Sequence, residues 1–229
     1  MTNIAEIINE NSTVAMVDKA YEADFVQRRR LGLSQVGHQC KRFLWYKHHG
    51  LDEPVPDGRV LRLFQLGNLL EDQIVKDLRL AGCIVYGAQK KIKITMDGIT
   101  LTGSCDGLIQ GIVEAPQTVH LWECKTMGAK GFKTLLKDGY EAYNPQYKGQ
   151  IHTYMLGLGL NRAFVTVYNK DTSAMYQERI KLNKGWVVDM LQDVFQAIRQ
   201  PEPPDRRCPR ADWWEGKLMC NFYEECFGV

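Results

Sequence analysis

The chain has 229 residues, enough for one large domain or one domain with an appendage. Its 45% hydrophobic and 24% charged residues are ordinary for a globular protein with a real core. The net charge of +2 argues neither for nor against a nucleic-acid partner. Because no apolar run approaches the roughly 18 residues of a membrane span and no secretory signal is recognisable, we expect a cytoplasmic protein without a membrane partner.

The first part of the chain is predicted to be helical. Residues 4–30 carry a helical pattern with polar interruptions, and Ser34 can cap a second helix that ends near residue 48. A loop with two prolines over 50–58 then precedes a strongly amphipathic helix over 60–80.

The rest of the chain alternates between strands and helices. Three β segments are predicted over 83–95, 99–110 (with a break at Gly103) and 118–125. They are followed by a helix over 145–159, two strands over 163–169 and 174–181, a helix over 183–199, and a tail rich in Cys and Trp. This order predicts an α/β sandwich around a mixed sheet, and not a doubly wound parallel sheet.

One pattern carries chemistry. Asp106 ends one predicted strand, and Glu123 and Lys125 lie on the next with the two-residue spacing that puts both side chains on one face. Carboxylate oxygens suit Mg²⁺ or Mn²⁺, and a nearby ammonium can orient water or offset charge on a phosphate. Cys124 would point into the core and leave its backbone carbonyl near the metal. Taken alone, the triplet is a weak signal, because such triplets occur by chance in many proteins, and it favours an exposed acidic–basic pair on a strand.

Two further features favour a site. Glu71 shares a helix face with apolar residues, where a carboxylate is costly unless it is paired or binds a metal; the alternative is a glutamate that reaches solvent. Gln150 and Tyr154 lie four apart on the helix after residue 144, so they face the same way and can bond a phosphate oxygen or a catalytic carboxylate.

The chain resembles the PD-(D/E)XK nuclease superfamily over roughly residues 34–160. The resemblance lies in the order and spacing of four motifs: a Glu on the first helix, Gly-x-x-Asp, Glu-x-Lys and Gln-x-x-x-Tyr. Residues 150–156 resemble the helix motif of its RecB-type exonuclease branch. The resemblance implies a restriction-endonuclease-like core, a central mixed β-sheet flanked by helices with N-terminal helices and a Cys-rich C-terminal tail. Two departures are a Cys in place of the Pro of the name motif, and no His on the first helix as a metal ligand.

The resemblance also implies roles for the pattern. Asp106 and Glu123 would bind Mg²⁺ or Mn²⁺ with help from Glu71, Lys125 would be the catalytic lysine, and Gln150 and Tyr154 would position the site or the DNA. The implied activity is a metal-dependent exonuclease that acts on single-stranded DNA or duplex ends in recombination, repair or viral replication, in a bacterial or phage-infected cytoplasm. A recombination or helicase protein is a possible partner. A structure-specific endonuclease with the same site and a non-catalytic DNA-binding recombination module are the alternatives.

Seven cysteines, an odd number in a chain without an export signal, favour metal ligation over disulfides. Four flank the predicted core: Cys40, Cys208, Cys220 and Cys226. Four thiolates suit a [4Fe–4S] cluster or tetrahedral zinc, with free thiols as the alternative. One N-terminal and three C-terminal cysteines resemble the iron–sulfur nucleases of the CRISPR-adaptation and AddB types, although Lys217 stands where those proteins have a cysteine.

We therefore expect one nuclease domain over 1–229. It would comprise an N-terminal helical region over 1–58, a nuclease core over 59–200, and a Cys-rich tail over 201–229 that docks on the N-terminal region. Trp213 and Trp214 in that tail would pack it against the body, or stack on bases.

Overall fold

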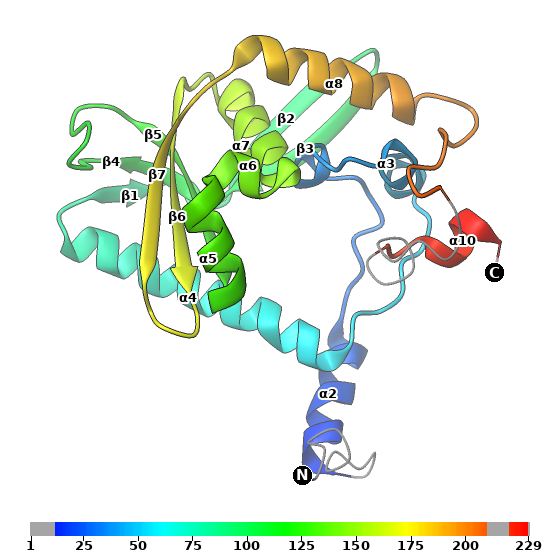
Figure 1. Cartoon of the computed structure of the whole chain (residues 1–229), viewed down its shortest axis with the longest axis horizontal. Coiled ribbons are helices and arrows are strands. Elements are labelled where there is room, and N and C mark those ends of the chain that lie inside the picture. Colours follow the sequence, from blue (N-terminus) through cyan, green and yellow to red (C-terminus); the bar gives the residue numbers. More distant parts are fainter. Residues whose placement is uncertain (1–11, 210–219, 229) are drawn as a thin grey trace.

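The computed structural model describes residues 12–209 and 220–228, and it centres on a five-stranded sheet of order β1-β4-β5-β6-β7 (Figure 1). β5 and β6 are parallel and the other neighbours are antiparallel, so the sheet is mixed, as predicted. A separate hairpin, β2-β3, lies outside it. The strands are β1 (Ile84–Tyr86), β2 (Lys90–Met96), β3 (Ile99–Cys105), β4 (Gly107–Gln110), β5 (His120–Met127), β6 (Arg162–Asn169) and β7 (Met175–Lys181).

Helices cover both faces of this sheet. A parallel pair of strands needs a crossover, and three helices between β5 and β6 supply it. Within residues 12–209 and 220–228, the helices and a 3₁₀ turn are α2 (Thr13–Asp24), η1 (Leu33–Gln35), α3 (Lys41–His48), α4 (Gly58–Leu80), α5 (Ala129–Asp138), α6 (Tyr140–Tyr143), α7 (Pro145–Leu158), α8 (Lys184–Ile198) and α10 (Tyr223–Phe227).

Alternation along the strands divides the core in two. Leu121 and Val165 face the larger apolar cluster, which α7 and α8 complete. Their neighbours Trp122 and Phe164 face the smaller cluster, in which Ile74 of α4 is fully buried. The central strands β5 and β6 are thus packed on both sides, and a polar side chain on either one is held in a fixed place.

The long helix α4 was predicted over 60–80 and is confirmed, but it begins at Gly58. Asp57 caps it by accepting the backbone N–H of Arg59 at 2.8 Å. The first turn packs closely on α2, and the Glu22 side chain accepts the Gly58 N–H at 2.8 Å.

The N-terminal helix is shorter than predicted. It ends at Asp24, and Phe25 is extended; residues 4–11 of the prediction lie outside the described residues. The chain beyond it is held by tertiary hydrogen bonds, in which Lys47 donates to the Arg28 carbonyl at 3.2 Å and Gln27 donates to that of Glu53 at 2.9 Å. These contacts override the weak local helical preference.

The helix predicted to be capped by Ser34 is also wrong in its first half. Residues 33–35 form only a 3₁₀ turn, and the α-helix α3 begins at Lys41 after Cys40. Gly37 lies against the backbone of α7, so close that a Cβ on it would overlap Gly149. A continuous helix has no room at this crossing.

Two predicted strands are divided. Positive φ angles at Gly87 and Gln89 separate β1 from β2. The break in the second segment falls at Asp106 and not at Gly103, because Asp106 accepts a backbone N–H from β5. Gly103 instead lies within β3, paired with Ile92.

The remaining elements agree with the sequence. Asn144 caps α7 by accepting the Gln146 N–H at 2.9 Å, and Gly159 ends the helix in the left-handed conformation. β6, β7 and α8 are confirmed, while α5 and α6 were not predicted. In the described part of the chain, no helix is both long enough and apolar enough to cross a membrane.

The C-terminal part of the chain, with α10, returns to the side of the molecule where α3 lies (Figure 1). Arg42 donates to the Pro204 carbonyl at 2.7 Å and Trp45 to that of Gln200 at 2.8 Å. Phe222 is 2% exposed, with its ring centroid 5.3 Å from those of Phe43 and Tyr46.

Candidate active site

The candidate site centres on Glu123, in the middle of β5. Glu123 is 1% exposed and lies on the same face of the strand as Lys125. Two groups donate to its Oε1: Lys125 Nζ at 2.7 Å and Gln150 Nε2 of α7 at 2.5 Å. Its Oε2 is buried and has no hydrogen-bond partner among the residues that the structure describes. A buried carboxylate oxygen without a partner is costly, so this oxygen is available to a cation.

Two more carboxylates approach Glu123. Asp106 lies between β3 and β4, and its Oδ2 accepts the Cys124 N–H at 2.8 Å. Cys124 points to the opposite face, into the α4-side core, where it is 8% exposed. Glu71 extends from α4 and is half-buried. The structure thus brings together Glu71, Asp106 and Glu123 from three separate segments.

The pKa values express the crowding of these acids. Burial raises the pKa of Glu123 to about 8, with a contribution from Asp106 and an opposing one from Lys125. Burial, and then Asp106, raises the pKa of Glu71 to about 7. Burial also raises that of Asp106, against Lys125 and the Cys124 N–H. Bound positive charge would relieve this cost, so the residues present fit a divalent cation.

Lys125 places a positive charge among these acids. Burial would lower its pKa, but the Glu123 carboxylate raises it well above its usual range. The ammonium also lies 5.2 Å from the centroid of the Tyr147 ring. A permanently charged group is therefore held against the carboxylates.

Tyr154 lies one turn beyond Gln150 on α7, as the i, i+4 spacing predicts. It is 2% exposed, it hydrogen-bonds with Gln150, and burial raises its pKa. The absence of a side chain at Gly103 makes room for it, because a Cβ there would lie 3.0 Å from the Tyr154 hydroxyl.

Two tyrosines near the site were missed by the sequence analysis. Tyr140 of α6 is fully buried, its hydroxyl has no hydrogen-bond partner, and burial raises its pKa, which the charges of Lys125 and Glu123 also influence. Its ring stacks on that of Tyr147, with centroids 5.4 Å apart. Tyr140 lies on α6, which the sequence does not predict, and no spacing signal distinguishes Tyr147 on α7.

The four flanking cysteines also approach one another. Burial raises the pKa of the Cys220 thiol, and Cys40, Cys226 and Cys208 each raise it further. Arg42 Nη1 lies 3.8 Å from Cys226 Sγ. Lys217, Trp213 and Trp214 lie outside the described residues. Over 12–209 and 220–228, no group of three or more His, Cys, Asp and Glu side chains is arranged as a ready-made metal site, at the cysteines or at the carboxylates.

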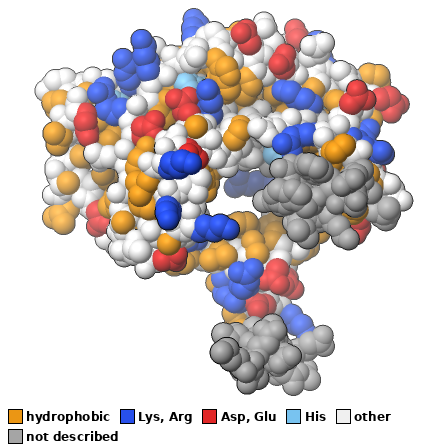
Figure 2. Space-filling view, viewed as in Figure 1, with side chains coloured by type: hydrophobic (Ala, Val, Ile, Leu, Met, Phe, Trp, Pro, Cys, Tyr) orange, Lys and Arg blue, Asp and Glu red, His pale blue; other side chains and the backbone are white. Residues whose placement is uncertain are grey.

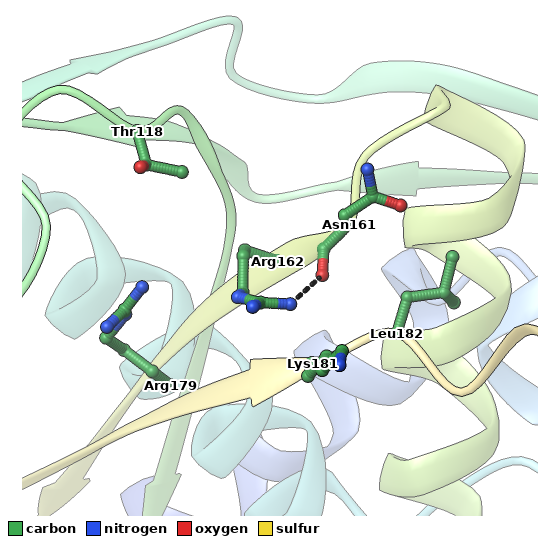
Figure 3. A pocket seen from close by; sticks show the side chains of 6 residues that line it. All are labelled: Thr118, Asn161, Arg162, Arg179, Lys181 and Leu182. Atoms are coloured by element: carbon green, nitrogen blue, oxygen red, sulfur yellow. Dashed lines mark hydrogen bonds between the residues drawn. The ribbon is translucent and has the colours of Figure 1, made fainter.

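A hollow of about 470 Å³ lies elsewhere on the sheet (Figure 3). It contains none of the predicted site residues. Its lining comes from the starts of β5 and β6 and the end of β7: Thr118, Asn161, Arg162, Arg179, Lys181 and Leu182.

No protein-family model matches the sequence, and no curated protein matches it. Among solved structures the chain is similar to SSO0001, with 15% identity, a TM-score of 0.52, and 93% of this chain and 95% of that one covered. It is also similar to the alkaline exonuclease LHK-Exo of Laribacter hongkongensis, with 19% identity, a TM-score of 0.53, and 78% and 89% covered. LHK-Exo in complex with dAMP matches at 17% identity and a TM-score of 0.53, with 79% and 88% covered.

At such identities the likeness establishes the fold. The chain is an α/β protein with a central mixed sheet flanked by helices, and it shares this fold with the alkaline exonuclease LHK-Exo.

Proposed function

We propose that this chain is a metal-dependent deoxyribonuclease that hydrolyses phosphodiester bonds at DNA ends. The observation that carries the proposal is the buried Glu123, with one oxygen held by Lys125 and Gln150 and the other unpaired. Buried acids with raised pKa values in one place are typical of functional sites. The similarity in fold to an alkaline exonuclease, also solved with dAMP, favours DNA ends as the substrate.

The residues divide the work between holding an ion and positioning the phosphate. Asp106 and Glu123 would hold Mg²⁺ or Mn²⁺, with Glu71 directly or through water, and with the Cys124 carbonyl. When bound, such an ion neutralises phosphate charge and supplies hydroxide at neutral pH.

The neighbouring groups would prepare the site. Lys125, kept charged by Glu123, offsets charge on the phosphate oxygens or orients the attacking water. Gln150 fixes the Glu123 carboxylate through its 2.5 Å hydrogen bond, and Tyr154 fixes Gln150 in turn.

The test is digestion of end-labelled single- and double-stranded DNA with Mg²⁺ or Mn²⁺. We expect the wild type to shorten labelled DNA and to spare closed circles, and Asp106→Asn to be inactive. Asp189→Asn, an exposed acid of α8, is the matched control and should keep full activity. Opening of closed circles would identify an endonuclease with the same site. If wild type and Asp106→Asn digest the labelled DNA to the same extent, the nuclease proposal is wrong. The alternative would then be a non-catalytic DNA-binding module.

We further infer that Cys40, Cys208, Cys220 and Cys226 ligate a [4Fe–4S] cluster, with zinc as the alternative. The Cys40, Cys226 and Cys208 thiols are near enough to Cys220 to raise its pKa, and this proximity supports the inference. Closing so long a loop with a metal clip would stabilise the fold by about 4–5 kcal/mol. The tail over 201–229 would thereby be held on the N-terminal region over 1–58, within one nuclease domain. Such a protein suits recombination, repair or viral replication, beside a helicase or recombination partner.

Anaerobic purification tests the cluster. We expect a brown protein with iron and sulfide, which Cys220→Ser loses and Cys83→Ser, a control outside the four, retains. A colourless preparation without iron and sulfide contradicts the cluster, and stoichiometric zinc in its place would identify the alternative.

A further inference from the structure

Along one side of α4, the side chains change from buried in the core, through half-buried at the candidate site, to exposed to solvent. At spacings of three and four residues, Ile74, Glu71, Gly67 and Phe64 share that side. Ile74 is fully buried against the sheet, and Glu71 is half-buried at the site. A Cβ on Gly67 would lie 3.6 Å from Thr126 Oγ1 of β5. The next residue on this side, Phe64, is 57% exposed.

This exposure is not needed by the fold. Leu63, Leu66 and Leu69, spaced three residues apart, form a second apolar row on the same stretch of α4, and all three are 40–58% exposed. Several exposed apolar side chains on one stretch of helix mark a binding surface. In Figure 2, hydrophobic side chains along α4 border a hollow in this face of the molecule, and Lys and Arg side chains lie beside it.

The position of Phe64 indicates what it meets. Seven residues of helix span about 10 Å, so Phe64 lies about that far from Glu71 along the helix, on the side that faces the site. A ligand that reaches both would carry a phosphate at the carboxylates and a flat apolar group a short distance away. A single-stranded nucleic acid has this form, because its unpaired bases expose faces that stack on aromatic rings.

The charge nearby agrees with this occupant. α5 begins three residues after Thr126, and its exposed lysines are Lys130, Lys133 and Lys137. Ammonium groups near the exit of β5 attract a phosphate backbone. Inside a duplex each base pair is stacked on both faces, so Phe64 can stack on an interior base only where the strands are separated.

We propose that Phe64 is a base-stacking platform that positions a single-stranded DNA end next to the Glu71, Asp106 and Glu123 site. This inference rests on the proposed nuclease function and names its substrate class, which is a single strand at the point of cleavage.

The experiment compares Phe64→Ala, Phe64→Trp and a matched control on the same helix, Leu80→Ala, whose side chain is 89% exposed far from Phe64. We expect Phe64→Ala to lower kcat/KM on single-stranded DNA by about 5- to 150-fold, Phe64→Trp to retain it, and Leu80→Ala to match wild type. Thermal melting checks that each variant folds.

Oligonucleotides with one abasic nucleotide at successive distances from the cleaved bond locate the contact. At one distance, the wild type should lose as much activity as Phe64→Ala does on intact DNA, and Phe64→Ala should lose nothing further. Equal kcat/KM for Phe64→Ala and Leu80→Ala overturns the inference and assigns the apolar patch to a protein partner. The inference is also overturned if, at every abasic position, the loss of activity from the missing base and the loss from Phe64→Ala multiply as independent effects. A wild type without any metal-dependent cleavage overturns the proposed function instead, and this inference with it.

Discussion

The hydrogen bonds and the pKa of the Glu123 carboxylate depend on side chains from other parts of the chain. Burial of this carboxylate, which is 1% exposed, raises its pKa to about 8, and the Lys125 ammonium opposes that rise. Here Lys125 and Gln150 both donate to one oxygen and leave the other unpaired. The spacing of Glu123 and Lys125 predicts their shared face, but only the structure shows that Gln150, from another element, completes the arrangement.

Lys125→Ala should remove most of the turnover and leave DNA binding largely intact. The ammonium is expected to act on charge that develops during hydrolysis, and loss of one such group lowers kcat by about 10²- to 10³-fold. Single-turnover digestion and fluorescence anisotropy, with Ca²⁺ as a non-catalytic ion, measure the two quantities. Lys184→Ala, exposed on α8, is the control; equal losses of binding and turnover would contradict the role proposed for Lys125.

His120 should make the protein less stable in mild acid. Its ring is fully buried, with Nδ1 2.9 Å from the Thr118 carbonyl and Nε2 accepting from Arg179 Nε at 3.2 Å. Burial lowers its pKa below 6.5, and Arg179 lowers it further. Since the folded pKa lies below the unfolded one, this contribution to stability is complete above about pH 6.5 and is lost as the pH falls toward the folded value, by about 1.4 kcal/mol for each unit of lowering.

The measurement is the melting temperature between pH 8 and pH 5. His120→Gln should decline less steeply than the wild type as the pH falls, whereas the exposed His49→Gln should keep the wild-type slope. Parallel curves for all three proteins would refute the assignment to His120.

At the scale of elements, the contact of α7 with β3 sets the geometry of the site. α7 supplies Gln150 and Tyr154, and β3 leads into Asp106. The sequence predicts a strand break at Gly103, because a glycine within a strand often marks an interruption of the strand. Its actual reason is close packing against Tyr154, which involves residues about 50 positions away and is not visible in local sequence.

Gly103→Ala should therefore destabilise the protein, by about 1–3 kcal/mol as for other overpacked core positions. The added Cβ would lie 3.0 Å from both Leu33 Cβ and the Tyr154 hydroxyl. Urea unfolding followed by circular dichroism measures the change. Gly185→Ala, at a helical position with nothing within 4 Å of the new Cβ, should be neutral or stabilising; a Gly103 variant as stable as that control would disprove the packing argument.

At the scale of the whole molecule, the segment after α8 returns to α3. Arg42 and Trp45 donate to backbone carbonyls of that segment, and Phe222 is buried against α3. These contacts connect residues more than 150 positions apart. Because α3 follows directly on Cys40, they also bring the cysteines of the two chain ends near one another.

Phe222→Ala should release the end of the chain without unfolding the core. Removing a buried Phe side chain costs about 3–5 kcal/mol, and here that cost falls on a local docking contact. Limited proteolysis with mass spectrometry should show early C-terminal trimming and a stable remainder. Val113→Ala, with a side chain 94% exposed, is the control. Global unfolding of Phe222→Ala would instead show that the docked tail is part of the cooperative core.

The elements with strong local signals can be predicted from the sequence. Periodicity and capping residues predicted α4, α7, α8, β6 and β7, and the two-residue spacing on β5 predicted that Glu123 and Lys125 share a face. The order of these elements was enough to predict a mixed sheet covered by helices.

Tertiary structure alone decided the rest. The short N-terminal helix, the late start of α3 and the break at Asp106 all follow from hydrogen bonds or close contacts with distant segments. The same holds for Tyr140 and Tyr147 beside Lys125, and for Phe64 beyond Glu71. Local sequence encodes backbone preference and the face of an element, whereas the partner of that face depends on which segments the folded chain brings together.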